Sequence, residues 1–245
     1  MMSDSELLSI QYRTLFLTSR LGRIERENDP DHTSGPRLWL AGCTLGNVGG
    51  GRCDVADGIA VEIGALLASE PPFITRNSLP THLDSYVELL SRGATAPTSN
   101  LGLIYQLPNG LQYESGATLI TSDSDEGQRL QTSLSNHGMP DQLVKLGFRN
   151  VSDLWLPWCM ARQEDRLVSV AFAARLSQAG ACLGVVTVPA FRGKGYAAAV
   201  TAGWSRLPSL RSRALFYSTD QSNTSSQRVV ARLGLRFLGA SLRLI

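Results

Sequence analysis

The sequence predicts an α/β fold in which helices flank a mixed central sheet, together with an additional, mainly helical N-terminal region. Two observations carry this prediction. In the second half of the chain, short, mostly apolar runs such as residues 183–188 and 214–218 alternate with helix-forming segments. The chain of 245 residues, with 43% hydrophobic composition, is also long enough to bury a full core. We therefore expect a sheet-based domain with further structure before it.

Residues 1–93 are predicted to form the helical region. Apolar residues recur at helical spacing between residues 5 and 19, and the polar start at Ser3 suits a helix N-terminus. Proline and glycine residues mark the ends of the later helices. The other elements expected here are a strand at residues 37–44 and helices at residues 55–69 and 81–91.

The glycine-rich segment at residues 46–52, GNVGGGR, resembles a phosphate loop at first sight. It lacks a following Lys-Ser/Thr pair and a clear helix start, so we predict a flexible hairpin tip instead. Residues 94–100, ATAPTSN, have the composition of a linker. The sequence therefore predicts two regions, residues 1–93 and residues 94–245.

The second region is predicted from strand runs, helix periodicity and turn residues. A strand at residues 101–107 is expected to enter a hairpin at Asn109-Gly110, with a strand at 117–122 after it. A run of small and helix-forming residues from Ala197 predicts a helix after the strand at 183–188. The remaining elements are helices at 126–134, 141–146, 197–206 and 225–233, and strands at 158–162, 167–174, 183–188, 214–218 and 237–244.

The segment after residues 183–188 has the features of a phosphate-binding loop. Pro189 ends the strand because proline has no N–H for a ladder. Gly193 and Gly195 allow a tight turn with several N–H groups pointing into one concavity, just before a helix N-terminus. Arg192 and Lys194 add two positive charges. This combination predicts a site for a diphosphate.

The spacing of this loop matches neither a Walker loop nor a dinucleotide-binding fingerprint. Its sequence, Arg192-Gly193-Lys194-Gly195-Tyr196-Ala197, has the pattern Arg-x-x-Gly-x-Ala. It resembles the pyrophosphate loop of the Gcn5-related N-acetyltransferases (GNAT), which binds coenzyme A. Asn223, after the next strand, and Leu233-Gly234-Leu235, at the end of the last helix, stand at matching positions.

The resemblance implies a sheet of the acyl-CoA N-acyltransferase type in residues 94–245. It also implies transfer of an acetyl group from acetyl-CoA to a primary amine, by direct attack in a ternary complex. Ser226 is expected either to contact a phosphate or to cap its helix, and Tyr196 either to cover the adenine or to pack. The coenzyme-A-binding residues that the resemblance implies are Val186, Thr187, Val188, Arg192, Gly193, Lys194, Gly195, Tyr196, Ala197, Asn223 and Ser226.

The sequence departs from the family pattern at the residues that transfer protons. Val230 stands where many members have a tyrosine that protonates the thiolate, and residues 183–188 contain no carboxylate. The catalytic residues are therefore left unassigned, and a non-catalytic protein that binds coenzyme A for regulation or interaction is the alternative. The residues weighed for these roles are Tyr113, Glu114, Glu164, Asp165, Tyr217, Ser218 and the three histidines, His32, His82 and His137.

Charge is distributed unevenly along the chain. Residues 180–245 hold nine Arg or Lys against one acid, a net +8, whereas the whole chain carries +2, so residues 1–179 carry −6. This asymmetry indicates a polyanionic ligand in the C-terminal part. Coenzyme A fits better than nucleic acid, because the cations are scattered over separate elements and aromatic residues make up only 7%. The acidic remainder is compatible with a cationic amine as acceptor.

Composition sets the remaining expectations. The four cysteines are widely spaced and have no nearby histidine, so neither a metal site nor a disulfide framework is predicted. The sequence contains no apolar run near 18 residues and no signal peptide, which indicates a cytoplasmic protein without membrane partners. The acceptor and the oligomeric state are left open.

Overall fold

The structure, a computed structural model, describes residues 2–245 and confirms an α/β fold with a mixed central sheet. The helices are α1 (Asp4–Leu15), α2 (Asp57–Ser69), α3 (Leu83–Ser91), α4 (Asp125–His137), α5 (Asp141–Val144), α6 (Tyr196–Ser205) and α7 (Thr224–Leu233), with 3₁₀ turns at η1 (Val151–Asp153), η2 (Pro189–Phe191) and η3 (Pro208–Leu210). The strands are β1 (Phe16–Thr18), β2 (Ile24–Glu27), β3 (Leu38–Cys43), β4 (Gly46–Gly51), β5 (Ser99–Leu107), β6 (Thr118–Thr121), β7 (Trp158–Gln163), β8 (Arg166–Leu176), β9 (Gly180–Thr187), β10 (Ala214–Asp220) and β11 (Arg236–Leu244).

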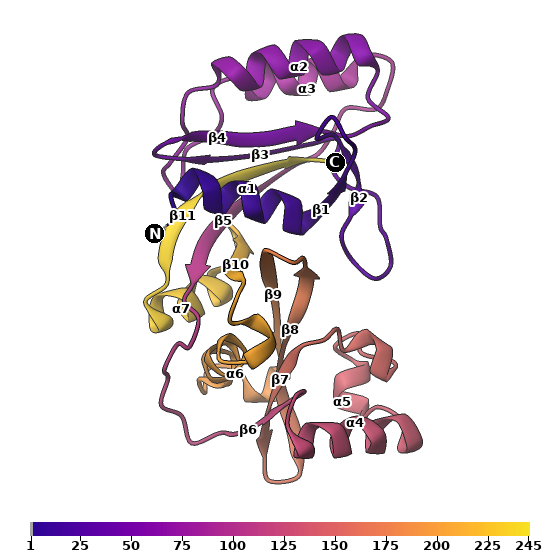
Figure 1. Cartoon of the computed structure of the whole chain (residues 1–245), viewed down its shortest axis with the longest axis vertical. Coiled ribbons are helices and arrows are strands. Elements are labelled where there is room, and N and C mark those ends of the chain that lie inside the picture. The colour runs from indigo at the N-terminus through magenta and orange to yellow at the C-terminus, as the bar shows by residue number, and fades with distance from the viewer. Residues whose placement is uncertain (1) are drawn as a thin grey trace.

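Within residues 2–245, one sheet of nine strands has the order β4-β3-β11-β5-β10-β9-β8-β7-β6 (Figure 1). Its neighbours are antiparallel except β9 and β10, which run parallel. The connection between these two strands is α6, as expected of a parallel pair joined by a crossover. Strands β1 and β2 form a separate two-stranded sheet.

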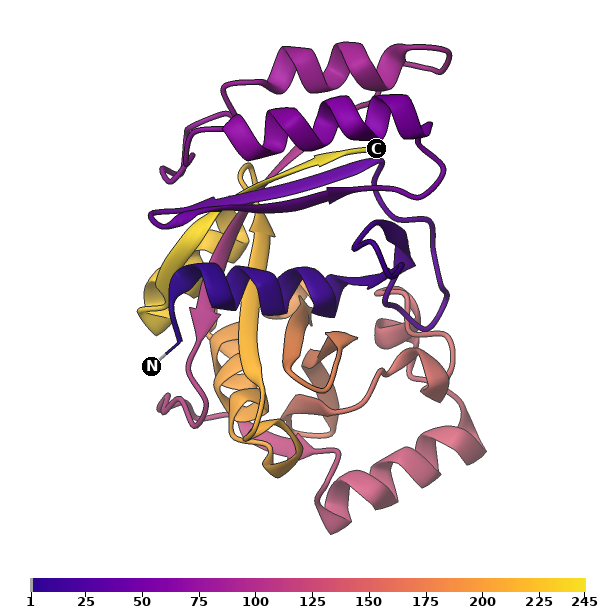
Figure 2. The same ribbon diagram turned by 45° about the horizontal axis from the view of Figure 1, so that its top comes forward.

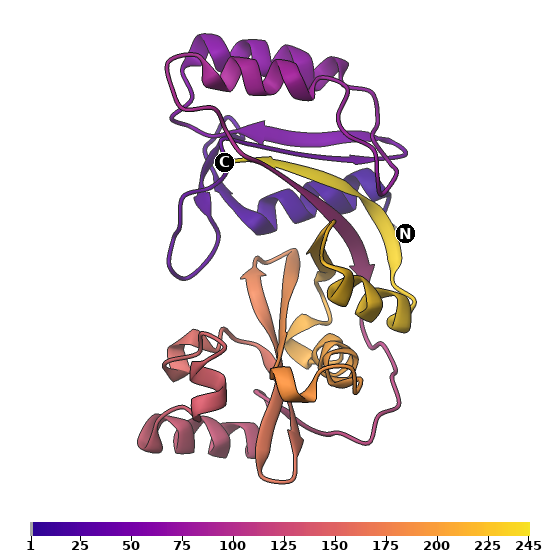
Figure 3. The same cartoon turned by 180° about the vertical axis from the view of Figure 1, so that it is seen from behind.

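Helices cover both faces of the large sheet. On one face, α1 packs over the centre of the sheet and α4 and α5 pack over one end (Figure 2). On the other face, α6 and α7 cover the centre and α2 and α3 cover the other end (Figure 3). Successive residues of β10 therefore face different layers: Phe216 packs with α1, and Tyr217 packs with α6 and α7. Among residues 2–245 no helix has the length and hydropathy of a membrane span.

The N-terminal region contributes more strand than the sequence predicts. The predicted strand at residues 37–44 is present as β3, but the segment predicted as a flexible hairpin tip is β4, paired with β3 over six residues. Its glycines suit close packing under α1, because a Cβ on Gly50 would collide with the Tyr12 hydroxyl. The sheet therefore continues from residues 94–245 into residues 1–93, and a division of the chain at residue 93 stays a prediction.

The hairpin predicted at Asn109-Gly110 is wrong. β5 lies in the middle of the sheet, between β11 and β10, whereas β6 forms the far edge beside β7. The turn is held by the end of α6 and by η3 instead of a second strand. Gly110 N–H donates to the Ser205 carbonyl at 2.9 Å, and the Asn109 amide donates to the Leu210 carbonyl at 2.9 Å. These tertiary contacts direct the following segment across the sheet.

Candidate functional site

The sheet opens between its two parallel strands. β9 and β10 pair at only three positions, ending at Cys182 and Phe216, although β8 stays paired with β9 as far as Thr187. β10 likewise stays paired with β5 as far as Asp220. A bulge in β8 lies opposite Cys182 and Leu183, where β9 leaves β10. Because a bulge bends and twists a strand locally, it accounts for the divergence at this point.

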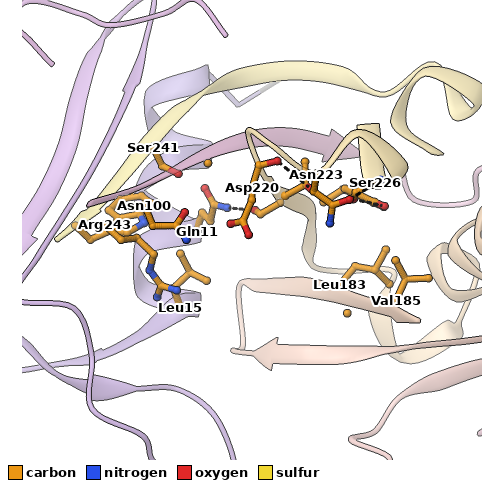
Figure 4. Close-up of a pocket in the computed structure, with 16 residues that line it drawn as sticks. Gln11, Leu15, Asn100, Leu183, Val185, Asp220, Asn223, Ser226, Ser241 and Arg243 are labelled. Carbon is orange, nitrogen blue, oxygen red and sulfur yellow. Dashed lines mark hydrogen bonds between the residues drawn. The ribbon is translucent and has the colours of Figure 1, made fainter. Parts of the chain in front are cut away.

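A cavity of about 380 Å³ fills the resulting wedge (Figure 4). Its volume is at the lower end of the range for small-molecule sites. The cavity passes between the strands and therefore reaches both faces of the sheet. We call its two ends the loop end, lined by Leu183, Val185, Tyr217, Asn223 and Ser226, and the α1 end, lined by Gln11, Leu15, Trp39, Asn100, Ser218, Asp220, Ser241 and Arg243.

On the face of the loop end, β9 continues into the predicted phosphate-binding loop. Gly193 and Gly195 have φ values of +77° and +89°, in the left-handed region that favours glycine. Among the described residues, no protein acceptor contacts the backbone N–H groups from Gly193 to Ala198. Six consecutive donors, of which the last belongs to a buried residue, thus surround the start of α6. An anion with several oxygen atoms fits this donor set.

Positive side chains surround this loop. Arg192 and Lys194 are exposed, and a Cβ built on Gly195 would lie 3.3 Å from Nη1 of Arg232 on α7. Within residues 2–245 none of these three cations makes a salt bridge. Unpaired cations beside unpaired N–H groups reinforce an anion site. Arg232 was not predicted, since only the fold brings α7 against the loop.

The start of α7 lies at the loop end of the cavity. The Asn223 side chain caps this helix by accepting a hydrogen bond from Ser226 N–H at 3.0 Å. The Ser226 hydroxyl pairs with the Tyr217 hydroxyl at 2.8 Å, so this serine is not the capping residue. Burial raises the pKa of Tyr217, while the bond to Ser226 acts in the opposite direction. The phenol therefore keeps its proton at neutral pH and can donate it.

The α1 end of the cavity presents acceptors. Gln11 is almost completely buried, and its Nε2 donates to the Ser218 hydroxyl at 2.8 Å. Its Oε1 is buried and has no hydrogen-bond partner among the described residues. The Asp220 carboxylate, at the end of β10, lines the same cavity (Figure 4). Within residues 2–245 Asp220 makes no salt bridge.

The structure brings together some of the predicted residues and separates others. Asn223 and Ser226 line the cavity, and Arg192 to Ala197 form the loop and the first turn of α6. On β9 the cavity is lined by residues 183–185, earlier in the strand than the predicted Val186, Thr187 and Val188. The Tyr196 hydroxyl donates to Gln163 and its ring lies 6.2 Å from that of Phe191, which is a packing role.

Most of the candidates for proton transfer lie elsewhere. Glu164 and Asp165 are exposed in the turn between β7 and β8. Tyr113 lies against the loop, where a Cβ on Gly195 would be 3.1 Å from its hydroxyl. Of the residues weighed from sequence, Tyr217 and Ser218 line the cavity. Asp220 and Gln11 were missed: Asp220 appeared only as the single acid of residues 180–245, and nothing in the sequence connects Gln11 with it.

Known structures show similarity to this chain at low sequence identity. A GCN5-related N-acetyltransferase from Sphaerobacter thermophilus is 16% identical, with a TM-score of 0.41, over 88% of this chain and 78% of that one. A GCN5-related N-acetyltransferase-like protein from Streptococcus suis is 14% identical, with a TM-score of 0.42, over 86% and 85%. An acetyltransferase of the GNAT family from Colwellia psychrerythraea is 17% identical, with a TM-score of 0.40, over 60% and 56%.

The chain therefore spans less than two thirds of the length of the Colwellia protein. No family model matches the sequence. No curated protein is similar to it either. Likeness at this level says nothing about activity or substrate.

Proposed function

We propose that this protein is an N-acyltransferase that moves an acetyl group from acetyl-CoA to a primary amine. One observation carries the proposal: among the described residues, six N–H groups without a protein acceptor and three cations without a salt bridge lie on the same face as the mouth of a cavity that passes through the sheet. The diphosphate of coenzyme A would bind the loop, through Gly193 to Ala198 with Arg192, Lys194 and Arg232. Its thioester arm would enter the wedge between β9 and β10.

The cavity also holds a group suited to the leaving thiolate. Tyr217 lies at the loop end, and the raised pKa that burial causes keeps its phenol protonated. In the family pattern that the sequence resembles, a tyrosine on the last helix has this role, but here the position is Val230, which is buried. Tyr217, from the neighbouring strand, would donate the proton instead, with Ser226 orienting its hydroxyl.

A second candidate is a protein that binds coenzyme A without turnover. It is favoured by Val230 and by the absence of any carboxylate in residues 183–188. Both candidates use the same loop and the same wedge. They differ only in whether the protein groups beside the thioester catalyse transfer of the acetyl group.

Two measurements test the proposal. Calorimetry with coenzyme A should show binding to one site, and absence of binding would reject both candidates. Release of free thiol from acetyl-CoA is then followed with a panel of primary amines. Release above the hydrolysis background with at least one amine supports the enzyme, whereas binding with no release across the panel supports the non-catalytic protein.

A further inference from the structure

The α1 end of the cavity has three features that the coenzyme A site does not explain. It lies on the opposite face of the sheet from the phosphate-binding loop. It holds a carboxylate, Asp220, that has no cation partner among the described residues. It also holds a buried acceptor, Gln11 Oε1, for which the described part of the chain supplies no donor. A buried acceptor without a donor is costly, so this arrangement indicates a ligand that supplies one.

The net charge of this end comes from Asp220. Arg243 also lines the cavity. Its Nη2 is paired with Glu27, whereas its Nε is buried and has no acceptor among the described residues. The same Glu27 accepts from Arg175 at 3.0 Å, and Arg175 also lies 3.1 Å from Asp29. These two arginines and two acids balance one another. The α1 end therefore favours a cation and disfavours a ligand with a second, negative group.

We propose that the α1 end is the acceptor site and that it takes a small primary ammonium compound without a carboxylate. The ammonium group has three N–H donors, and the Asp220 carboxylate and Gln11 Oε1 supply acceptors for them. Ser218, which accepts from Gln11 Nε2, holds that side chain in place. The inference rests on the proposed function, since it assigns the acceptor for the same reaction.

The arrangement also assigns the base. Asp220 takes one proton from the bound ammonium, which gives the neutral amine that can attack. The amine nitrogen forms a bond to the acyl carbon, the C–S bond breaks, and the thiolate receives a proton from Tyr217. The nitrogen loses a second proton as the amide forms, and this proton restores the Tyr217 phenol, while Asp220 passes the first proton to water. The products are the N-acetyl amine and coenzyme A as a free thiol, with one net proton released to water.

Two acceptors of the same chain length test the substrate class. 3-Aminopropanol carries only the ammonium charge, whereas β-alanine carries a carboxylate in addition. With the full chain and saturating acetyl-CoA, kcat/KM for 3-aminopropanol should exceed that for β-alanine by at least about 10-fold, because Asp220 repels the carboxylate. Equal or better use of β-alanine would overturn the inference and leave the proposed function standing.

Variants test the residues. Asp220→Asn should raise KM for 3-aminopropanol by about 10- to 100-fold, since a hydrogen bond to a charged group is lost, and should leave KM for acetyl-CoA unchanged. It should also lower kcat, because the base is removed. Gln11→Leu should raise the same KM by less, about 3- to 10-fold. Asp31→Asn is the control, because Asp31 is an exposed acid outside the cavity. An unchanged amine KM in Asp220→Asn would contradict the assignment.

If the protein shows no turnover, a binding experiment with the amine still tests the inference. Saturation-transfer NMR of 3-aminopropanol with the protein loaded with coenzyme A should show contact that Asp220→Asn weakens and Asp31→Asn preserves. Absence of contact, or equal contact in both variants, would overturn the acceptor site. Failure to bind coenzyme A in calorimetry would instead reject the proposed function, so the two failures are distinguishable.

Discussion

The two ends of the cavity between β9 and β10 offer opposite chemistry. The loop end presents donors and positive charge, and most of those donors are backbone N–H groups. The α1 end presents the Gln11 side-chain oxygen and the Asp220 carboxylate, and neither has a partner within residues 2–245. One wedge in the sheet can thus serve an anionic and a cationic ligand on opposite faces. The divergence of β9 and β10 is therefore the structural feature that joins the two sites.

The largest expected effect concerns charge at the loop end. Gly193→Asp places a carboxylate where the diphosphate should bind, and like charges about 4 Å apart cost about 4 kcal/mol at an effective dielectric near 20. Affinity for coenzyme A should fall at least about 100-fold in calorimetry. Gly193→Asn is the matched control, because both side chains tolerate positive φ and a Cβ here meets no atom within 4 Å. Equal affinities in the two variants would show that the loop does not hold the phosphates.

The second largest effect concerns the Tyr217 phenol at the loop end. Tyr217→Phe should lower kcat by about 100-fold by removing the proton donor, with no change in affinity for coenzyme A. Because burial raises the pKa of Tyr217, ionisation of this phenol should cause no loss of rate between pH 7 and about pH 9. Tyr105→Phe serves as the control, since Tyr105 pairs with Tyr217 across the β5–β10 ladder and its hydroxyl has no hydrogen-bond partner in the part of the chain that the structure describes. An unchanged kcat in Tyr217→Phe would assign the thiolate's proton to another group.

The smallest effect concerns Asn223, which caps α7 beside the loop end. Asn223→Asp keeps an oxygen for Ser226 N–H and should preserve stability, whereas Asn223→Ala should lower the free energy of unfolding by about 1 kcal/mol. Both variants lose the amide donor, so affinity for coenzyme A should fall by about 3- to 10-fold in each. Denaturant unfolding and calorimetry separate the two properties. Unchanged affinity in both variants would limit Asn223 to the capping role.

Sequence could predict the loop end because its geometry is local. Gly193 and Gly195 adopt the positive φ that their spacing suggests, and Asn223 follows its strand in the turn expected before the last helix, which it caps. The α1 end could not be predicted, since Gln11 reaches Ser218 across 207 residues of sequence. β4 is a second case of long-range packing. Its glycines predict a flexible hairpin tip, but α1 packs closely on them, and the sequence does not show this contact. Hydrophobic periodicity does not encode long-range packing, and this packing determines the structure of both the α1 end and β4.

A crystal structure with coenzyme A bound tests the central claim most directly. The account predicts diphosphate oxygens within hydrogen-bonding distance of the N–H groups from Gly193 to Ala198. It also predicts that the thiol lies between β9 and β10, beside the Tyr217 hydroxyl, with the α1 end of the cavity still open. Coenzyme A bound elsewhere on the protein, or with its thiol outside the wedge, would contradict the account.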